Sequence, residues 1–370
     1  MRKTGGKSGH ALVVTRRLAS LWIARDPTSS NRAPMDSNIL AGAESHTWTV
    51  AVKTTLTLVS LMIVTKLYLA WTKGIYKGSK QMHGKTVIVT GGNAGIGKEA
   101  AKELARRGAH VILACRNMEK GQRAAEEIFV DTGRTVAVKR LDLCSFKSVR
   151  QFADEILNTE QRIDVLINNA GIFPDRIQLT GDGYEECLQA NYLGHFLLTL
   201  LLTERLKKSA PSRVINLTSS LHHVGTTHRL DEQARGTPPW LTPTLAYSNS
   251  KMAMVSFTRR MAHKLQAYGV TVNAVHPGIV NTSIADKESF MTFVLRCLYN
   301  TIGKTPWEGA QTVVHAAVDD RFTHDTGKYL VDCREAWMNW RALGGQEARK
   351  VFETSVGLVG LNLDEVQKLF

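Results

Sequence analysis

The decapeptide TGGNAGIGKE, at residues 90–99, constrains the fold of this chain more than any other stretch. It follows the apolar, β-branched run KTVIVT, which predicts a buried strand, and it precedes residues with helical spacing. Gly91, Gly95 and Gly97 lie within seven positions in the turn between these two elements. Such a turn leaves free N–H groups and the positive end of a helix facing outward, which suits a bound phosphate. The glycines alone would also fit an ordinary strand–helix turn, so the remaining sequence has to decide.

After residue 84, strand-like and helix-like segments alternate along the chain. Apolar runs predict further strands at residues 111–115, 135–141, 164–167, 213–217, 270–275 and 328–331. Helical periodicity predicts helices at residues 121–129, 146–157, 192–206, 248–265 and 307–318. This alternation predicts an α/β fold, a Rossmann-type doubly wound parallel sheet with helices on both faces. We place it in a single catalytic domain at residues 82–345 and treat residues 346–370 as a C-terminal tail.

An apolar stretch at residues 54–71 precedes that domain. It is about long enough to cross a bilayer, which needs ~17–25 residues, and Trp48 and Trp71 bracket it as interfacial aromatic residues do. Lys66 lies near one end, where its side chain can reach the interface. We therefore predict a transmembrane signal-anchor helix at residues 47–73. The alternative is a hydrophobic helix that docks on the protein.

The charge of the chain is unevenly distributed. The net charge is +14, and residues 1–35 contain seven basic residues and one acidic residue. No basic helix interleaved with aromatic residues follows, so we expect a membrane surface and no nucleic acid as a partner. Residues 1–46 are interpreted as a basic N-terminal extension and linker, although their first 34 residues also fit a mitochondrial presequence. Lysines after the apolar stretch favour a catalytic domain that faces the cytosol. We predict a membrane location at the endoplasmic reticulum, with a mitochondrial membrane as the alternative.

The cysteines and histidines suggest no metal site. Five cysteines are widely spaced and form no CxxC motif, which favours reduced thiols in a cytosol-facing or matrix-like compartment. His222, His223 and His228 have no carboxylate or cysteine at ligand spacing, so no bound metal is expected. His195, within an apolar helix, is expected to be a hydrogen-bonded core histidine.

Several side chains that follow the glycine turn in the sequence suggest nucleotide-dependent chemistry. Arg116 ends the second predicted strand, about twenty residues on, where an acid suits the ribose of NAD and an arginine suits the extra phosphate of NADP. Tyr247 and Lys251 are four residues apart on one helix face, where the ammonium favours the phenolate and makes the tyrosine a candidate acid/base. Ser220 follows a strand and could hold a substrate oxygen. Asn191 could tether a water beside Lys251.

Taken in order, these motifs resemble those of the short-chain dehydrogenase/reductase family over roughly residues 82–335. They comprise the glycine turn, Asp142 in LDL, the NNAG motif at 168–171, Asn191, Ser220, Tyr247 with Lys251, and Pro277-Gly278. Stretches such as LINNAG, NYLGHFLLT and AVHPGIVNT further resemble the NADP-dependent retinol dehydrogenase subgroup. The resemblance implies the catalytic residues Asn191, Ser220, Tyr247 and Lys251. For NADP(H), it implies binding by Gly91, Asn93, Gly95, Ile96, Gly97, Arg116, Asp142, Asn168, Tyr247, Lys251, Pro277, Gly278, Val280 and Thr282.

The resemblance also implies a reaction. It is hydride transfer between NADP(H) and a lipophilic alcohol or its carbonyl, with retinol and retinal as first choice and steroids, polyprenols and lipid aldehydes left open. Ser220 is chosen over Ser219 because it precedes the apolar Leu221, as the catalytic serine of the family does. Asn168 is expected to lie by the adenosine ribose and to steady the central strand. The loop at 283–305 has an apolar face that suits a lid, and the helices flanking residues 220–251 would form a homodimer. A non-catalytic NADP(H)-binding scaffold is the competing class.

Overall fold

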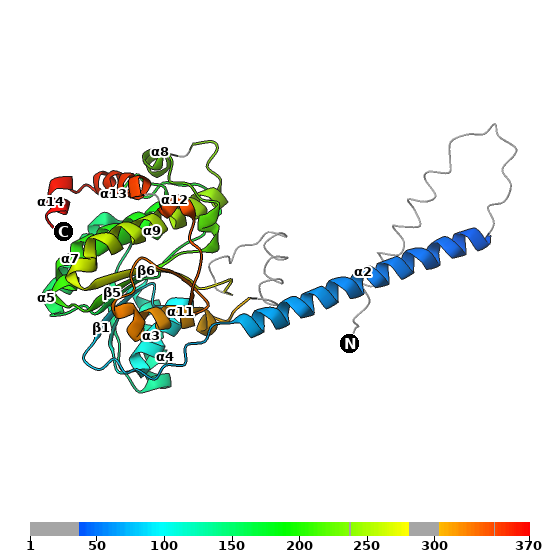
Figure 1. The fold of residues 1–370 in the computed structure, drawn as a ribbon, viewed down its shortest axis with the longest axis horizontal. Coiled ribbons are helices and arrows are strands. Elements are labelled where there is room, and N and C mark those ends of the chain that lie inside the picture. Colours follow the sequence, from blue (N-terminus) through cyan, green and yellow to red (C-terminus); the bar gives the residue numbers. More distant parts are fainter. Residues whose placement is uncertain (1–36, 237, 281–302, 344) are drawn as a thin grey trace, which may run out of the picture. The chain divides into compact units, whose positions relative to one another are not determined.

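The computed structural model describes residues 37–236, 238–280, 303–343 and 345–370. The chain divides between Thr65 and Lys66 into two units. The described part of the N-terminal unit belongs to one long helix, α2 (Ser37–Thr72). The C-terminal unit holds a parallel sheet with helices on both faces (Figure 1). The α/β fold expected from the alternation of strands and helices is therefore confirmed.

The sheet of the C-terminal unit has the strand order β3-β2-β1-β4-β5-β6-β7-β8. The first seven strands pair in parallel, and β8 runs antiparallel to β7. The order runs outward from β1 in both directions, so the sheet is doubly wound and the direction of winding switches between β1 and β4. The strands are β1 (Thr86–Thr90), β2 (His110–Cys115), β3 (Ala137–Arg140), β4 (Val165–Asn168), β5 (Ser212–Leu217), β6 (Val270–His276), β7 (Tyr329–Val331) and β8 (Arg334–Glu335).

The helices form two layers, one on each face of this sheet (Figure 1). The principal helices are α3 (Gly95–Arg106), α4 (Met118–Thr132), α5 (Phe146–Thr159), α7 (Gly194–Lys208), α9 (Pro243–Leu265), α11 (Pro306–Val318) and α13 (Gly345–Leu358). Shorter helices are α6 (Glu186–Leu188), α8 (Leu230–Arg235), α12 (Trp340–Leu343) and α14 (Leu363–Gln367). Single turns are η1 (Gln189–Leu193, π-helical) and the 3-10 turns η2 (Ser220–His223), η3 (Gln266–Tyr268) and η5 (Asp320–Thr323).

Alternate residues of each central strand enter opposite layers. On β1, Val87 and Val89 pack with α3, α4 and α11, whereas Ile88 packs with α5, α7 and α9. All five residues of β1 are buried. A strand covered on both faces reads as a continuous apolar run, and this explains why the sequence of β1 shows no polar alternation.

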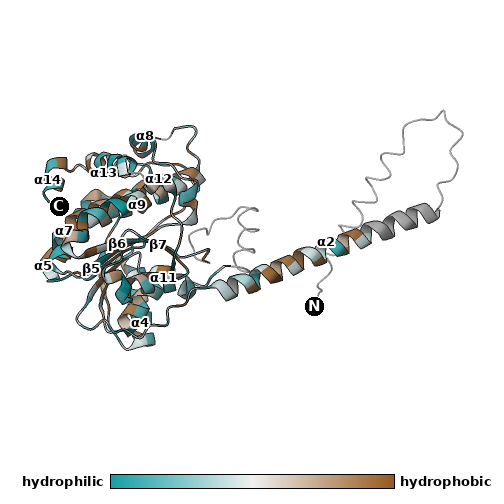
Figure 2. Ribbon diagram, viewed as in Figure 1, coloured by the Kyte–Doolittle hydropathy of each residue, from teal (hydrophilic) through white to brown (hydrophobic). Residues whose placement is uncertain are grey.

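Helix α2 contains the apolar stretch predicted to cross a membrane. The window Trp48–Tyr68 spans 21 residues with a mean hydropathy of 1.6, and none of it is buried. Figure 2 shows this run of hydrophobic residues along α2. Trp48 begins the window, Trp71 follows its end by three residues, and both are exposed. By length and composition this helix could cross a membrane, and the rest of the described chain contains no second such helix.

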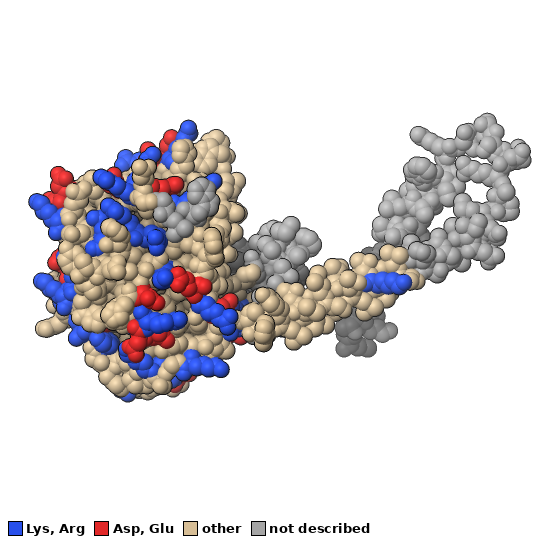
Figure 3. Space-filling view, viewed as in Figure 1, with Lys and Arg blue, Asp and Glu red and all other residues tan. Residues whose placement is uncertain are grey.

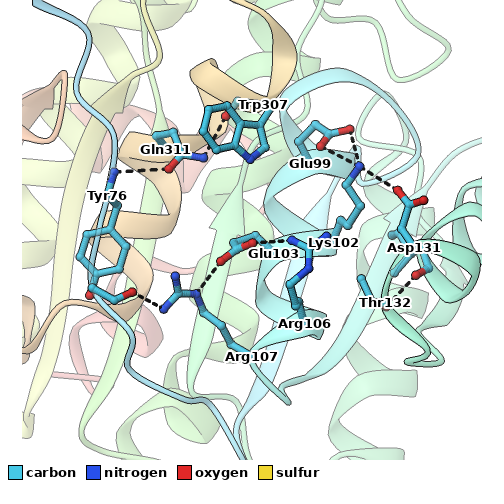
Figure 4. Close-up of polar contacts among 12 residues, drawn as sticks. Tyr76, Glu99, Lys102, Glu103, Arg106, Arg107, Asp131, Thr132, Trp307 and Gln311 are labelled. Atoms are coloured by element: carbon cyan, nitrogen blue, oxygen red, sulfur yellow. Dashed lines mark hydrogen bonds and ion pairs between the residues drawn. The ribbon is translucent and has the colours of Figure 1, made fainter.

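Residues 73–82, which we call the strap, connect α2 to the start of the sheet and lie along α3 and α11. Tyr76 N–H donates to Gln311 Oε1 of α11 at 3.3 Å, and the Tyr76 ring lies 5.3 Å from the Arg107 guanidinium (Figure 4). Arg107 also donates to the carbonyls of Gly78 (2.8 Å) and Lys80 (3.0 Å). The strap is therefore bonded to the unit along most of its length.

Residues 346–370 are not a separate tail. They form α13 and α14, and α13 lies against α9 (Figure 1). Phe352 is buried with its ring 5.4 Å from that of Phe196 on α7, and the hydroxyls of Tyr192 and Ser355 are 2.7 Å apart. The chain's own C-terminal helix α13 thus contacts α7 and α9, the helices expected to pair with a second copy of the chain. A predicted boundary at residue 345 does not match the packing, because apolar residues such as Phe352 belong to the same core.

Charged side chains are interspersed on the face of the C-terminal unit that Figure 3 shows, with basic and acidic groups side by side. Many of the basic groups pair with acids, as Lys98 does with Glu127 and Lys102 with Asp131 between α3 and α4. Exposed pairs of this kind each contribute little to stability. Their effect is to balance locally the excess of positive charge in the chain.

Candidate active site

A cavity of about 910 Å³ opens along the carboxyl ends of the parallel strands. Its walls come from the residues that follow β1, β2, β3 and β4, together with the ends of β5 and β6 and one face of α9. The switch between β1 and β4 lies within this row of strand ends. Ligands of doubly wound sheets bind at this edge, outside the switch point. The volume is within the range of pockets that hold drug-sized ligands, about 300–1,000 Å³.

The glycine turn forms one wall of the cavity. Gly91 and Gly95 have φ of 65° and 55°, which glycine adopts readily. A Cβ added to Gly97 would lie 2.4 Å from Asn169 Nδ2 and 2.6 Å from the Gly91 carbonyl oxygen, so the helix can start here only with glycine. Ala94 precedes α3 and offers no side-chain cap to its first N–H groups. These donors face the cavity at the positive end of a 12-residue helix, which suits an anion.

The end of the cavity beyond this turn is lined by Arg116 and Asp142. Arg116 directly follows β2, at the position predicted from the sequence, and is exposed. Asp142 follows β3 and is half-buried, and its carboxylate accepts the Cys144 N–H at 3.0 Å. Asn93 and Ile96 also line this part of the cavity. The predicted nucleotide residues of the first three strand–helix turns therefore line the same cavity.

The two asparagines of the NNAG motif point in different directions. Asn168 is buried, and its Nδ2 donates to Asn216 Oδ1 at 2.8 Å and to Thr199 Oγ1 at 3.0 Å. Its side chain ties β4 to β5 and α7, and it does not line the cavity. Asn169 lines the cavity and donates from Nδ2 to the Thr90 carbonyl at 2.8 Å. Sequence reasoning selected Asn168 for the ribose, whereas the structure brings Asn169 to the glycine turn.

The same region contains His195. Its Nε2 lies 2.8 Å from Thr90 Oγ1 and its Nδ1 lies 3.2 Å from the Asn191 carbonyl oxygen. Burial lowers the pKa of His195 to about 3, so the ring stays neutral at physiological pH. The expectation of a hydrogen-bonded core histidine agrees with this environment.

Helix α9 brings Tyr247 and Lys251 to the cavity wall. Thr242 caps this helix by accepting the Leu245 N–H, and Pro243 occupies its first turn. The Lys251 Nζ lies 5.5 Å from the centre of the Tyr247 ring and donates to the Leu217 carbonyl at 3.2 Å. Lys251 is buried, and burial lowers its pKa to about 8. A buried ammonium one helical turn from a phenol at a cavity wall is the arrangement predicted from the spacing.

Asn191 lies behind Lys251. It belongs to η1, and its Oδ1 accepts the Ile172 N–H at 2.7 Å. Its Nδ2 donates to the Ile172 carbonyl at 3.0 Å and to Ser250 Oγ at 3.1 Å. A Cβ added to Gly171 would lie 3.2 Å from Asn191 Oδ1 and 3.5 Å from Lys251 Nζ, so the three groups are neighbours. π-Helical turns such as η1 occur mainly at functional sites.

Two consecutive serines follow β5. Ser219 is half-buried, and its Oγ accepts the Leu221 N–H at 3.3 Å as the cap of η2. Ser220 is the first residue of η2 and is exposed. Ser219 only accepts this hydrogen bond and keeps its own O–H for donation, so both serine hydroxyls could contact a substrate. Ser220 lies just outside the residues that line the cavity, two positions after Thr218, which is one of them.

The loop after β6 closes the other end of the cavity, and Pro277 lines it. Gly278 has φ of 88°, and an added Cβ would lie 2.9 Å from Lys304 Nζ. Lys304 is buried, pairs with Asp332 and donates to the Pro277 carbonyl at 3.2 Å. Val280 pairs with Lys304 in a parallel bridge. Sequence reasoning missed Lys304, since nothing in its spacing marks it.

The remaining predicted residues of this loop are outside the described ranges. Thr282 and residues 283–302 of the expected lid are among them.

Comparison with known proteins gives consistent matches over this region. A family model described as enoyl-(acyl carrier protein) reductase matches residues 91–302. Retinol dehydrogenase 12 of Bos taurus is 45% identical over 289 residues, which cover 78% of this chain and 90% of the relative. Retinol dehydrogenase 11 of Homo sapiens is 44% identical over 292 residues, which cover 79% of this chain and 91% of the relative.

Solved structures share the fold of this chain and align with most of its length. An uncharacterised protein of Mycobacterium paratuberculosis aligns with a TM-score of 0.62 and 32% identity over 76% of this chain and 96% of its own. A Beutenbergia cavernae protein described as an NAD(P)-dependent gluconate 5-dehydrogenase, with NADP bound at low occupancy, aligns with a TM-score of 0.55 and 27% identity. That alignment covers 69% of this chain and 97% of the other. Most of this chain therefore aligns with nearly the whole length of these proteins.

Proposed function

Because this chain belongs to the short-chain dehydrogenase/reductase family and is an oxidoreductase, we propose that it interconverts a lipophilic alcohol and its carbonyl with NADP(H) while anchored in a membrane. Retinol and retinal are the first substrates to test. The observation that carries the proposal is the pairing of Tyr247 and Lys251 at the wall of a cavity whose far end holds the glycine turn and Arg116. A protein that only bound the nucleotide would have no need of the phenol.

The residues of the cavity fit a nicotinamide dinucleotide. The uncapped N–H groups at the start of α3 suit its pyrophosphate, and the exposed Arg116 suits the 2′-phosphate that distinguishes NADP from NAD. Pro277 and Gly278, held by Lys304, would border the nicotinamide end. When bound, the cofactor supplies or accepts the hydride. A relative of known structure carries NADP, which supports the choice of nucleotide.

The chain's own groups move the proton and orient the substrate. In carbonyl reduction, the Tyr247 hydroxyl donates its proton to the substrate oxygen, and in alcohol oxidation it accepts one. The Lys251 ammonium would stabilise the phenolate that forms and bind the nicotinamide ribose. Ser220 donates a hydrogen bond to the substrate oxygen. Asn191 holds the loop after β4 against α9 and completes the proton relay.

Membrane anchoring and the lipophilic substrate support each other. Helix α2 carries a 21-residue apolar window without buried residues, and such a helix would hold the enzyme where lipid-soluble substrates dissolve. We propose the endoplasmic reticulum membrane with the catalytic unit in the cytosol. Reduction is the expected direction there, because cells keep most of their NADP reduced. Retinol dehydrogenases 11 and 12 lead the choice of substrate through their similarity to this chain.

The test is NADPH oxidation by the full chain in microsomes supplied with all-trans-retinal. We expect Tyr247→Phe to lower kcat at least ~100-fold, in the range that general acids contribute, while NADPH still binds. Tyr268→Phe is the matched control, because Tyr268 is exposed on η3, outside the cavity, and its substitution should leave kcat unchanged. Arg116→Ala should raise the KM for NADPH and leave the KM for NADH unchanged.

The outcomes separate the competing functions. Turnover that survives in Tyr247→Phe would contradict the assigned acid/base. Turnover of a steroid or polyprenol carbonyl in place of retinal would keep the mechanism and change the substrate. NADPH binding without turnover of any carbonyl would favour a non-catalytic scaffold.

A further inference from the structure

The turn that carries Ser220 contains a buried imidazole. Within η2, Ser220 and His223 are exposed, whereas His222 has no exposed surface. Backbone hydrogen bonds along this short turn run from His222 N–H to the Ser219 carbonyl (3.0 Å), from Val224 N–H to the Leu221 carbonyl (3.2 Å) and from Gly225 N–H to the His222 carbonyl (3.2 Å). Short 3-10 turns have poor hydrogen-bond geometry. Side-chain contacts must therefore contribute to the position of Ser220.

Both ring nitrogens of His222 are bonded to backbone groups. The Nδ1 lies 2.7 Å from the Ser219 carbonyl oxygen, which can only accept a hydrogen bond. The Nε2 lies 3.2 Å from the Asn339 backbone nitrogen, which can only donate. The imidazole is thus neutral with its proton on Nδ1. Burial is the main cause that lowers the pKa of His222 to about 4, in agreement with the neutral form.

The side chain of Asn339 also forms hydrogen bonds with this turn. Its Nδ2 donates to the carbonyls of His222 (3.3 Å) and His223 (3.1 Å), and its Oδ1 accepts the Arg341 N–H at 3.0 Å. Asn339 lies between β8 and α12, more than a hundred residues after the turn, and is buried. On another side, the His222 ring lies 4.8 Å from the ring of Tyr329 on β7.

The opposite flank of the turn is bonded to the catalytic helix. Asn249 on α9 accepts the Thr226 N–H at 2.8 Å, two residues after Tyr247. The serine turn is therefore held between the C-terminal segment and the helix that carries the candidate acid/base. Any shift of the His222 side would move Ser220 relative to Tyr247.

We propose that His222, clamped by Asn339, is a positioning residue that fixes Ser220 against Tyr247. This inference rests on the proposed function, because Ser220 acts on the substrate only there. A metal role for His222 does not fit: both its nitrogens are engaged, and among the described residues no three His, Cys, Asp or Glu side chains form a cluster that could hold an ion. A misplacement of about 1 Å in a catalytic group can cost on the order of 100-fold in rate. The contacts of His222 and Asn339 with this turn, which we call the clamp, would prevent a displacement of Ser220 of this size.

The first experiment compares His222→Phe and Asn339→Ala with His223→Ala in the full chain in microsomes. His222→Phe keeps an aromatic ring of similar volume and loses both hydrogen bonds. We expect both clamp variants to lower kcat for carbonyl reduction about 10- to 100-fold. The Kd for NADPH should stay within about twofold, since the clamp does not touch the dinucleotide wall. His223→Ala removes an exposed ring from the same turn and should leave kcat near that of the unaltered chain.

Two further variants test the coupling. His222→Phe combined with Asn339→Ala should be no slower than the slower single variant, because both remove one clamp. His222→Asn keeps a donor near the Nδ1 position and should recover part of the lost kcat.

Hydrogen exchange of residues 218–226 provides a readout that does not need turnover. We expect faster exchange there in both clamp variants, with exchange in α9 unchanged. If no carbonyl is turned over by the unaltered chain, the proposed function fails while exchange still decides the clamp. An unchanged kcat and unchanged exchange in His222→Phe would overturn the positioning role. An equal loss of NADPH affinity and kcat would also overturn it, since that pattern reports general damage.

Discussion

Lys251 places an ammonium group in a buried environment, where the charged form is disfavoured. Its Nζ is buried at the cavity wall, and the Leu217 carbonyl accepts a hydrogen bond from it. Burial lowers the pKa of Lys251 from 10.5 to about 8. A negatively charged dinucleotide bound in this cavity would stabilise the buried ammonium electrostatically and offset the unfavourable free energy of its burial.

This environment predicts how stability depends on pH. Below pH 8, Lys251 is protonated in both states and folding bears the full cost of burying the ammonium. Between pH 8 and 10.5 the unfolded chain binds the proton and the folded chain does not, so the group's contribution to stability rises with pH. The unfolding free energy of the unaltered chain, relative to that of Lys251→Met, should therefore rise by about 3 kcal/mol across this window. Urea unfolding in detergent at pH 7 and pH 10 measures it, and parallel pH profiles for the two proteins would contradict the assignment.

At the residue scale, sequence reasoning located the groups whose spacing along the chain is local. The glycine turn, Arg116, Tyr247 and Lys251 follow from spacing within one strand–helix unit or one helical turn, and all of them line the cavity. It missed Lys304 and Asn339, whose partners lie 27 and 117 residues away along the chain. No periodicity encodes contacts of that kind, because they exist only after the layers pack.

At the scale of elements, the strap shows how a connecting segment can be fixed without regular structure. Arg107, at the end of α3, donates to the carbonyls of Gly78 and Lys80 in the strap. Its guanidinium also lies beside the Tyr76 ring (Figure 4). Its neighbour Arg106 pairs with the same acidic residue, Glu103, but its side chain is exposed. The two arginines therefore differ mainly in their contact with the strap.

We expect Arg107→Ala to release the strap and Arg106→Ala to leave it in place. Loss of the two hydrogen bonds from a charged donor and of the cation–π contact should lower the unfolding free energy by about 2–4 kcal/mol. Arg106→Ala should change it by less than about 1 kcal/mol, the usual range for an exposed ion pair. Hydrogen exchange of residues 73–82 and urea unfolding provide the measurements. Equal effects of the two substitutions would show that the strap gains nothing specific from Arg107.

Element prediction was good for the central strands and poor for the shortest elements and for the C-terminal helix α13. The central strands were located within one or two residues, because a buried parallel strand is an unbroken apolar run. The two-residue strand β8 and the turn η2 were not predicted. Their residues show no period, and neighbouring segments, such as Asn339 beside η2, hold them in place.

On the scale of the whole molecule, the C-terminal helices occupy the surface that sequence reasoning assigned to a second copy of the chain. Helix α13 packs on α9, and its Phe352 and Ser355 contact α7 and η1 through Phe196 and Tyr192. Further bonds reach the following residues, from Arg150 to the Val359 carbonyl and from Tyr184 to the Leu358 carbonyl. Pairing of two copies through α7 and α9 would have to displace all of these contacts.

The C-terminal helices therefore predict the outcome of their removal. Phe352→Ala should lower the unfolding free energy by about 3–5 kcal/mol, because it leaves a cavity among buried rings. Phe129→Ala is the control, since Phe129 is about half exposed on α4 and its loss should cost less than about 1 kcal/mol. Deletion of residues 345–370 should uncover the apolar faces of α7 and α9 and drive self-association, measured by sedimentation velocity in detergent. A full chain whose copies cross-link through cysteines placed on α9 beneath α13 would show instead that the C-terminal helices yield to a partner.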